Sequence, residues 1–262
     1  MEVPSDHRPA VEAAQRRALT VGAVASVVVA VVLAVIVSIL LGALALVVLG
    51  TGWVLLVQSA FARAQDRVVA GIGREVRPNE LPGFRNALEG VALLTGVAEP
   101  AIRLVDSPAA NAMAAAGAAG STVVVTSGIL ERDSPVESEV LAAELLCRVR
   151  DGSARYATLV AGLPPAVRLA AGLSESSLAS TFGEQWALRG DFDAVAVTRY
   201  PPGLISAFEK MQERGTEVAG VAPSTAPMWI APAVGRGAGV AEAVDRVANQ
   251  PISYRIDALR EL

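Results

Sequence analysis

The sequence SPVESEVLAAELLCRVRDG, residues 134–152, predicts a single amphipathic helix. Ser134 can cap the first turn, and Glu137, three residues later, can reach back to the backbone of Ser134, which makes a capping box. Pro135 suits the first helical position, and Gly152 follows two arginines that favour a helix C-terminus. Apolar residues recur at helical spacing between these ends, so we expect one face of the helix to be buried: Val136, Val140, Leu141, Leu145 and Val149.

The centre of this helix has the sequence Ala143-Glu144-Leu145-Leu146-Cys147. A zinc metallopeptidase would carry His-Glu-x-x-His here, because residues four apart share one helical face and can direct two imidazoles at one metal. The glutamate is present as Glu144, but Ala143 and Cys147 stand where the histidines would be. His7, near the N-terminus, is the only histidine in the chain.

The residues around Glu144 resemble the active-site helix of the HtpX-like membrane zinc peptidases, relatives of the CAAX prenyl proteases. Further segments follow in the order of that family: an Asn-Ala-bulky-Ala turn at 111–114, a Val/Thr strand at 122–126, and Thr-Arg-Tyr-Pro-Pro-Gly-Leu at 198–204. A closing segment at 250–260 completes a resemblance that covers residues 18–262. It implies an α+β fold, with an N-terminal transmembrane helical hairpin before a mostly helical, zincin-like domain with a small β-sheet.

The resemblance also implies where a substrate and a metal would lie. In such families the strand at 122–126 resembles an edge that binds extended peptide by strand addition. The expected substrate-binding groove therefore comprises Asn111, Ala112, Val123, Val124 and Val125. The alternatives without a role in peptide binding are a strand in the core at 122–126 and a turn residue at Asn111.

The third zinc ligand of the family is a Glu four residues before an Asp. Counting back from Thr198 places the Asp, a group that would support the ligands, at Asp191 and the ligand at Ala187. A register shifted by two residues would choose Asp193 and Arg189 instead. Neither register supplies a carboxylate ligand.

Zinc is the cofactor of the family, but the ligand positions Ala143, Cys147 and Ala187 predict that no metal binds. Catalytic zinc needs about three protein ligands, and it lowers the pKa of its bound water from about 15.7 to about 7. Without that pKa shift, deprotonating the attacking water costs on the order of 10 kcal/mol more free energy. Glu144, at the general-base position, is therefore expected to be vestigial.

The remaining reactive side chains allow other interpretations. As a nucleophile, Cys147 would require a nearby base to form its thiolate. The simpler interpretation is that Cys147 is a small side chain buried on one face of the helix. Glu144 and Asp191 could form a carboxylate pair, whereas ion pairs with Arg148 or Arg189 are the simpler outcome.

The N-terminal part of the chain is expected to cross a membrane twice. No charged residue occurs in residues 18–62, a run of 45 residues, and one crossing needs about 20. Gly42 is the expected turn, which gives spans near 19–39 and 43–60 and places Trp53 toward an interface. A signal peptide would be shorter, and a hairpin buried in a soluble core is the other alternative.

Arginines at both ends of this run predict its orientation. Arg16 and Arg17 precede the first span, and Arg63 and Arg67 follow the second, so the positive-inside rule places both ends in the cytoplasm. We thus expect a disordered cytoplasmic tail at 1–17, a hairpin at 18–62 in the plasma membrane and a cytosolic peptidase-like domain at 63–262. The lipid bilayer is then a partner, whereas a net charge of -4 without a basic stripe excludes nucleic acid.

Periodicity predicts the remaining elements of the domain. Helices are expected at 84–95, 182–198 and 204–214, and a short strand at 101–105. Residues 156–173 hold too short an apolar run to cross a bilayer, so a re-entrant or surface helix is expected there. Residues 174–180 are expected to be a polar linker.

Three functional hypotheses follow. The leading one is a membrane-anchored, zinc-free pseudopeptidase that binds a protein or peptide partner or regulates an active peptidase relative. The second is an active or residual metalloendopeptidase that cleaves membrane or misfolded proteins with atypical ligands such as Cys147, Asp191 or Asp193. The third is a structural membrane protein whose hairpin assembles with other helices through Gly42, Gly50 and Gly52.

Overall fold

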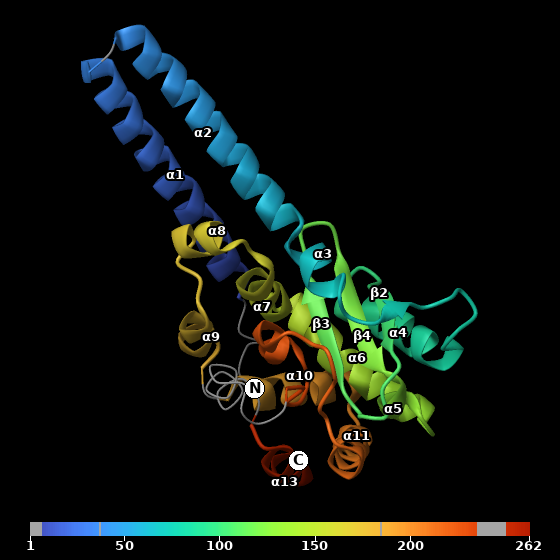
Figure 1. The fold of residues 1–262 in the computed structure, drawn as a ribbon. Coiled ribbons are helices and arrows are strands. Elements are labelled where there is room, and N and C mark those ends of the chain that lie inside the picture. The colour runs from blue at the N-terminus through green and yellow to red at the C-terminus, as the bar shows by residue number, and fades with distance from the viewer. Residues whose placement is uncertain (1–6, 37, 184, 235–249) are drawn as a thin grey trace.

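The computed structural model describes residues 7–36, 38–183, 185–234 and 250–262. A helical hairpin stands away from a mostly helical domain that is built on a small mixed sheet, as Figure 1 shows. The fold is therefore the α+β arrangement that the sequence predicts.

The hairpin consists of α1 (Arg8–Ile36) and α2 (Ile39–Ala62), both long and apolar enough to cross a membrane. The turn between them includes Ser38, whose hydroxyl caps α2 by accepting from the Leu41 N–H at 3.3 Å. The prediction of a turn at Gly42 was wrong, because Gly42 lies within α2. A Cβ there would lie 2.6 Å from the Ala34 Cβ, so this glycine allows the two helices to pack closely. Trp53 donates its indole N–H to the Ala18 carbonyl of α1 at 2.9 Å.

The expected disordered tail is in part helical. Residues 8–17 continue α1 toward the N-terminus, because Val11 and Ala14 pack into the core of the domain. His7 is buried, and its ring lies edge-on against Phe182 at a centroid distance of 4.9 Å. Residues 1–6 lie outside the described residues.

The sheet has four strands, β1 (Arg74–Glu75), β2 (Ala101–Val105), β3 (Ala112–Ala116) and β4 (Ser121–Thr126), in the order β1-β2-β4-β3. β4 pairs parallel with β2 and antiparallel with β3, and β1 is antiparallel to β2. The strands expected at 101–105 and 122–126 are confirmed. The edge role that the resemblance implies for 122–126 does not hold, and the alternative of a core strand does, because β4 is hydrogen-bonded on both sides and β3 forms the edge.

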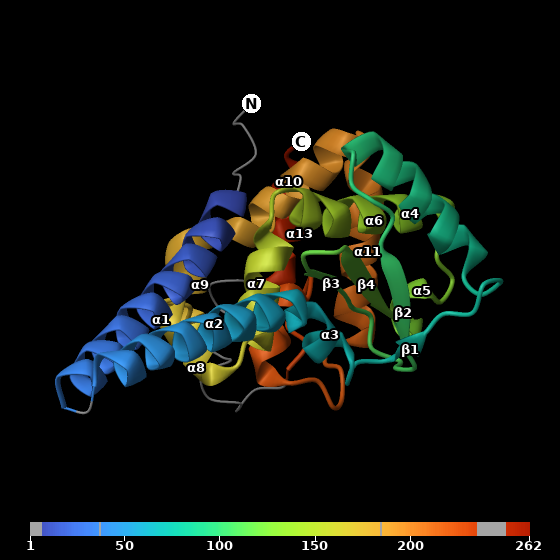
Figure 2. The same cartoon turned by 90° about the horizontal axis from the view of Figure 1, so that it is seen from above.

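Helices cover both faces of the sheet (Figure 2). Val123 and Val125 of β4 pack toward α4 (Pro82–Thr95) and α6 (Pro135–Arg150). Val124, which points the other way, packs with Met113 toward α7 (Ser153–Gly162). The strand alternation therefore divides the core into two apolar layers. The other helices have these bounds: α3 Ala64–Val69, α5 Ser127–Leu130, α8 Pro165–Ala170, α9 Glu175–Phe182, α10 Trp186–Thr198, α11 Pro201–Arg214, η1 Pro223–Met228 and α13 Ile252–Arg260.

The helices predicted at 84–95 and 204–214 are confirmed as α4 and α11, and α10 covers most of the helix predicted at 182–198. Two other predictions for this region were wrong in part. Residues 156–162 belong to a core helix, α7, because most of its side chains are small or apolar and buried, whereas the short α8 that follows is largely exposed and fits the expected surface helix. The expected linker at 174–180 is largely helix α9.

Candidate functional site

Helix α6 holds Glu144 in the middle of the domain. The capping box forms as predicted, with Ser134 Oγ accepting from the Glu137 N–H at 3.2 Å and Glu137 accepting from the Ser134 N–H at 3.4 Å. Glu137 also accepts from Lys210 Nζ of α11 at 2.8 Å, which ties the start of α6 to that helix. Downstream of this anchor, every residue from Val140 to Arg148 is buried.

Glu144 is fully buried and pairs with an arginine on its own helix. Its Oε1 accepts from Arg148 Nε at 2.8 Å and also from Arg148 Nη2. The four-residue spacing brings the two side chains together on one face of α6. Within the described part of the chain, Glu144 Oε2 is buried without a hydrogen-bond partner.

Asp191 is also fully buried and makes a bidentate pair with Arg255 of α13. Arg255 Nε donates to Oδ2 at 2.7 Å, and Nη2 donates to Oδ1 at 2.5 Å. Burial raises the pKa of Asp191, and the charge of Arg255 opposes that rise. Arg255 Nη2 lies 3.7 Å from Glu144 Oε1, so the two ion pairs form one network of alternating charges.

Each arginine of this network also stacks on an aromatic ring. The guanidinium of Arg148 lies 4.6 Å from the ring centroid of Trp186, and that of Arg255 lies 4.3 Å from the ring centroid of Phe208. Both guanidiniums are therefore enclosed by carboxylates and aromatic faces, which compensate for the loss of water.

The same arginines hold a segment that crosses the site. Arg148 Nη1 donates to the Trp229 carbonyl at 3.2 Å, and Arg255 Nη1 donates to the Ile230 carbonyl at 2.5 Å. Residues 228–231 thus lie directly beside the charge network. All four are buried: Met228, Trp229, Ile230 and Ala231.

This segment pairs with the edge strand of the sheet. Trp229 forms an antiparallel bridge with Met113 of β3, and the Ile230 N–H donates to the Ala112 carbonyl at 2.8 Å. Asn111 Nδ2 donates to the Ala231 carbonyl at 2.9 Å. The backbone groups of this end of β3, which an extended peptide would require, are therefore bonded within the chain.

The expected groove residues are brought together, but they are covered. Asn111, Ala112 and residues 123–125 are all fully buried, and Val123 and Val125 pack against α6 rather than lining a cleft. The space between β4 and α6 is filled by the side chains of the protein itself.

The residues at the three ligand positions, Ala143 and Cys147 on α6 and Ala187 on α10, are also buried. Burial raises the pKa of the Cys147 thiol to about 12. Across the described residues, no group of three or more His, Cys, Asp or Glu side chains is placed to hold a metal ion. In the alternative register, Asp193 has its pKa raised by partial burial, against the charges of Arg150 and Arg189.

Sequence reasoning identified Glu144, Arg148 and Asp191, but it gave no role to Arg255. Arg255 is separated from Asp191 by 64 positions, so no local spacing connects them. A signal was available, because Arg255 lies in the closing segment at 250–260 that carries the resemblance and falls inside an apolar helical pattern. A charge at such a position favours a buried counter-ion.

Comparison with known proteins finds distant relatives among proteases. The chain is 27% identical to a "Protease HtpX homolog" of Dictyoglomus turgidum, over 71% of this chain and 71% of that protein. It is 26% identical to a "Protease HtpX homolog" of Tropheryma whipplei, over 71% of this chain and 77% of the relative. No family model and no solved structure matches the chain. The protein is thus a distant homologue of the HtpX proteases.

Proposed function

We propose that this protein is a membrane-anchored HtpX homologue without peptidase activity, which acts as a binding or regulatory protein. The observation that carries this proposal is the buried ion pair between Glu144 and Arg148 at the position of the general base. The distant homology to HtpX proteases supplies the comparison with an active site.

A general base must reach a water molecule that attacks the substrate. Glu144 has no solvent-exposed surface, and one of its two oxygens is occupied by Arg148. Withdrawing this carboxylate from Arg148 would leave a buried charge unpaired, at a cost of several kcal/mol. The geometry therefore favours a structural role for Glu144.

The residues at the ligand positions do not fit zinc. The alanine side chains at 143 and 187 carry no ligating atom, and the Cys147 thiol, with a pKa of about 12, resists the deprotonation that a metal thiolate needs. In addition, Arg148 and Arg255 place two positive charges beside Glu144, and these would repel a divalent cation. We infer that zinc is not a cofactor of this chain.

The hairpin provides the membrane anchor in this proposal. Its two helices are 29 and 24 residues long, and a crossing needs about 20. Apolar side chains cover the outside of the hairpin, with Leu40 at its tip 83% exposed. Such a surface fits lipid and not water. With arginines at both ends, the hairpin would hold the domain on the cytoplasmic side of the plasma membrane.

The pairing of residues 228–231 with the edge strand β3 limits where a partner can bind. Because residues 228–231 already pair with β3, a protein partner or an active peptidase relative would contact another surface. The apolar side chains exposed on the hairpin offer one surface for such contact.

Metal analysis of the purified full-length protein, combined with a casein cleavage assay, tests the proposal. We expect substoichiometric zinc and no chelator-sensitive cleavage, with the same result for Glu144→Gln. Stoichiometric zinc that disappears in Cys147→Ala, or cleavage that disappears in Glu144→Gln, would instead support a residual metalloendopeptidase.

A structural role in helix assembly is the second candidate. A Cβ added at Gly50 or at Gly52 of α2 would meet no heavy atom within 4 Å, so this face of the hairpin is open to another helix. Gly50→Leu with Gly52→Leu would then reduce self-association in detergent crosslinking. Unchanged association of this double variant would remove this candidate.

A further inference from the structure

The base of the hairpin gathers four arginines that have no acidic partner among the residues that the structure describes. They are Arg17 in α1, Arg63 between α2 and α3, Arg67 in α3 and Arg168 in α8. Among the described residues, none of the four forms an ion pair, whereas the neighbouring Arg16 pairs with Glu12 at 3.3 Å. Four cations left without carboxylates at one place favour an anionic ligand.

The segment 162–172 connects three of these arginines, Arg17, Arg67 and Arg168. At its start, Arg67 Nη1 donates to the Gly162 carbonyl at 3.4 Å. At its end, a Cβ on Gly172 would lie 3.5 Å from Arg17 Nη1. Helix α8 lies between these two points, carries Arg168 and runs beside α1 at the base of the hairpin (Figures 1 and 2).

Helix α8 also presents an apolar side chain to the outside. Leu169, next to Arg168, is 82% exposed, whereas Val167 on the same helix is completely buried. A short helix that is fixed by one apolar residue and exposes another beside arginines has the composition of an element at a lipid interface.

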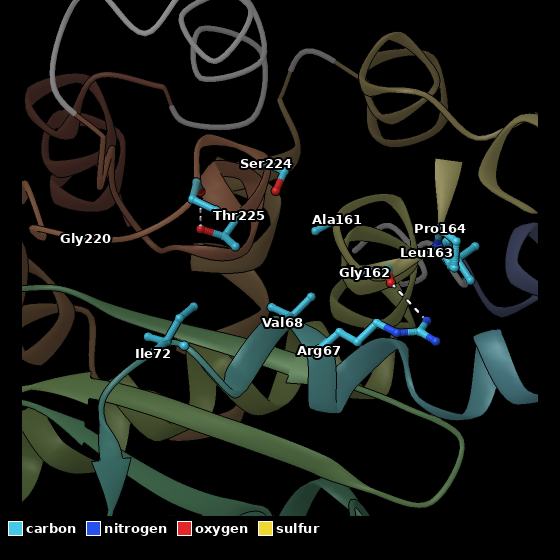
Figure 3. A pocket seen from close by; sticks show the side chains of 12 residues that line it. Arg67, Val68, Ile72, Ala161, Gly162, Leu163, Pro164, Gly220, Ser224 and Thr225 are labelled. Atoms are coloured by element: carbon cyan, nitrogen blue, oxygen red, sulfur yellow. Dashed lines mark hydrogen bonds between the residues drawn. The ribbon is translucent and has the colours of Figure 1, made fainter. Parts of the chain in front are cut away.

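A pocket of about 380 Å³ adjoins this segment, between α3, the turn from α7 to α8 and residues 220–225. Arg67 extends along one side toward Gly162, and Ser224 and Thr225 lie on the opposite side, as Figure 3 shows. The other lining side chains are mostly apolar: Val68, Ile72, Ala161, Leu163, Pro164 and Ala222. The volume is at the lower end for small-ligand sites.

Arg67 has donors to spare for a ligand in this pocket. Its Nη1 makes two long hydrogen bonds, to the carbonyls of Ala60 at 3.3 Å and Gly162 at 3.4 Å. A guanidinium has five N–H donors in a planar fork that matches a phosphate. A phosphate-bearing group is therefore the ligand chemistry that the pocket fits.

We propose that the base of the hairpin binds anionic phospholipid, with α8 at the bilayer surface and one phosphate headgroup in the pocket beside Arg67. This inference rests on the proposed membrane anchoring. The phosphate comes from the bilayer, because the pocket and the four arginines surround the point where the apolar hairpin meets the domain.

Thermal unfolding of the full chain in nanodiscs tests the proposal. We expect phosphatidylglycerol to raise the Tm by about 2–6 °C relative to phosphatidylcholine. Arg67→Gln with Arg168→Gln should abolish most of that rise while leaving the Tm in phosphatidylcholine close to that of the wild type. Arg260→Gln is the matched control, because Arg260 lies on α13 and pairs with Glu209 at 3.1 Å.

The outcomes separate this inference from the membrane proposal. Equal Tm values in both lipids, or a double variant that keeps the wild-type rise, would overturn the lipid site. A rise produced equally by inorganic phosphate in phosphatidylcholine nanodiscs would assign the site to a soluble phosphate and overturn the lipid source. Release of the chain from native membranes by carbonate would instead overturn the membrane anchoring itself.

Discussion

Arg148 Nε lies 2.8 Å from Glu144 Oε1, one helical turn away on α6, and both side chains are buried. In an HtpX-like peptidase the carboxylate at this position would serve a metal-bound water. Here it neutralises a guanidinium that also holds the Trp229 carbonyl at 3.2 Å. Glu144 is thus part of the buried core of the domain.

The first prediction concerns this pair. Arg148→Met should lower the free energy of unfolding by about 3–5 kcal/mol, because it removes the hydrogen-bonded partner of Glu144 and leaves this buried carboxylate only the 3.7 Å contact with Arg255. Adding Glu144→Leu to Arg148→Met should restore much of that stability. Urea unfolding monitored by tryptophan fluorescence measures both effects.

Arg260→Met serves as the control for this prediction. Its ion pairs with Asp257 at 3.5 Å and Glu209 at 3.1 Å are exposed, so the change should cost less than about 1 kcal/mol. If Arg148→Met and Arg260→Met destabilise the protein equally, the pair with Glu144 does not have the buried character described above.

The second prediction concerns Cys147. Burial raises the pKa of its thiol to about 12, from an ordinary value of 9.0. The folded protein therefore holds almost no thiolate at pH 8, and alkylation should be slower than in the unfolded chain by a factor of about 100 or more. A maleimide mass tag, added with and without guanidinium chloride, measures the ratio, and Cys147→Ser shows the background. Rapid labelling of the native protein would contradict the buried position.

The third prediction concerns Asp151, at the C-terminal end of α6. Burial raises the pKa of this carboxyl to about 7, although the Ser153 N–H donates to it at 2.8 Å. The folded state therefore keeps a proton between pH 3.8 and about 7 that the unfolded state has released. The contribution of this proton to the stability of the folded state is complete below pH 3.8 and is lost as the pH rises through about 7.

Asp151→Asn should consequently raise the Tm at both pH values, and the rise should be about 2–4 °C larger at pH 8 than at pH 5. Asparagine keeps the acceptor for Ser153 but carries no charge at either pH. The control is Asp257→Asn, a change at a largely exposed side chain, which should shift the Tm similarly at both values. If Asp151→Asn raises the Tm equally at pH 5 and pH 8, the Asp151 carboxyl does not titrate between these pH values.

These features differ in how far the sequence could predict them. The capping box of Ser134 and Glu137 and the pairing of Glu144 with Arg148 depend on residues three or four positions apart, which helix geometry fixes. The central place of β4 depends on its two partner strands, and the strand pattern of residues 123–125 is the same at an edge or in the middle. The turn prediction at Gly42 was wrong because a glycine suits both a turn and a close helix contact.

The network beyond Glu144 needed the structure, because its parts are distant in the chain. Asp191 meets Arg255 across 64 positions, and Asn111 meets Ala231 across 120. Such contacts depend on how helices and strands pack, and neither residue type nor local period determines them. The filled groove therefore could not be anticipated from the motif that suggested a groove.

The last prediction tests that filled groove. Asn111→Ala removes the hydrogen bonds from Nδ2 to the part-buried Thr216 carbonyl and the buried Ala231 carbonyl, both 2.9 Å, and leaves both acceptors without this donor. We expect a loss of about 1–3 kcal/mol of stability and faster amide exchange in residues 229–231, since the segment is less firmly held to β3. Hydrogen–deuterium exchange with mass spectrometry resolves the segment, and Asn86→Ala on the exposed surface of α4 is the matched control. Exchange at 229–231 that stays at the wild-type rate in Asn111→Ala would show that Asn111 does not hold the segment against the edge strand.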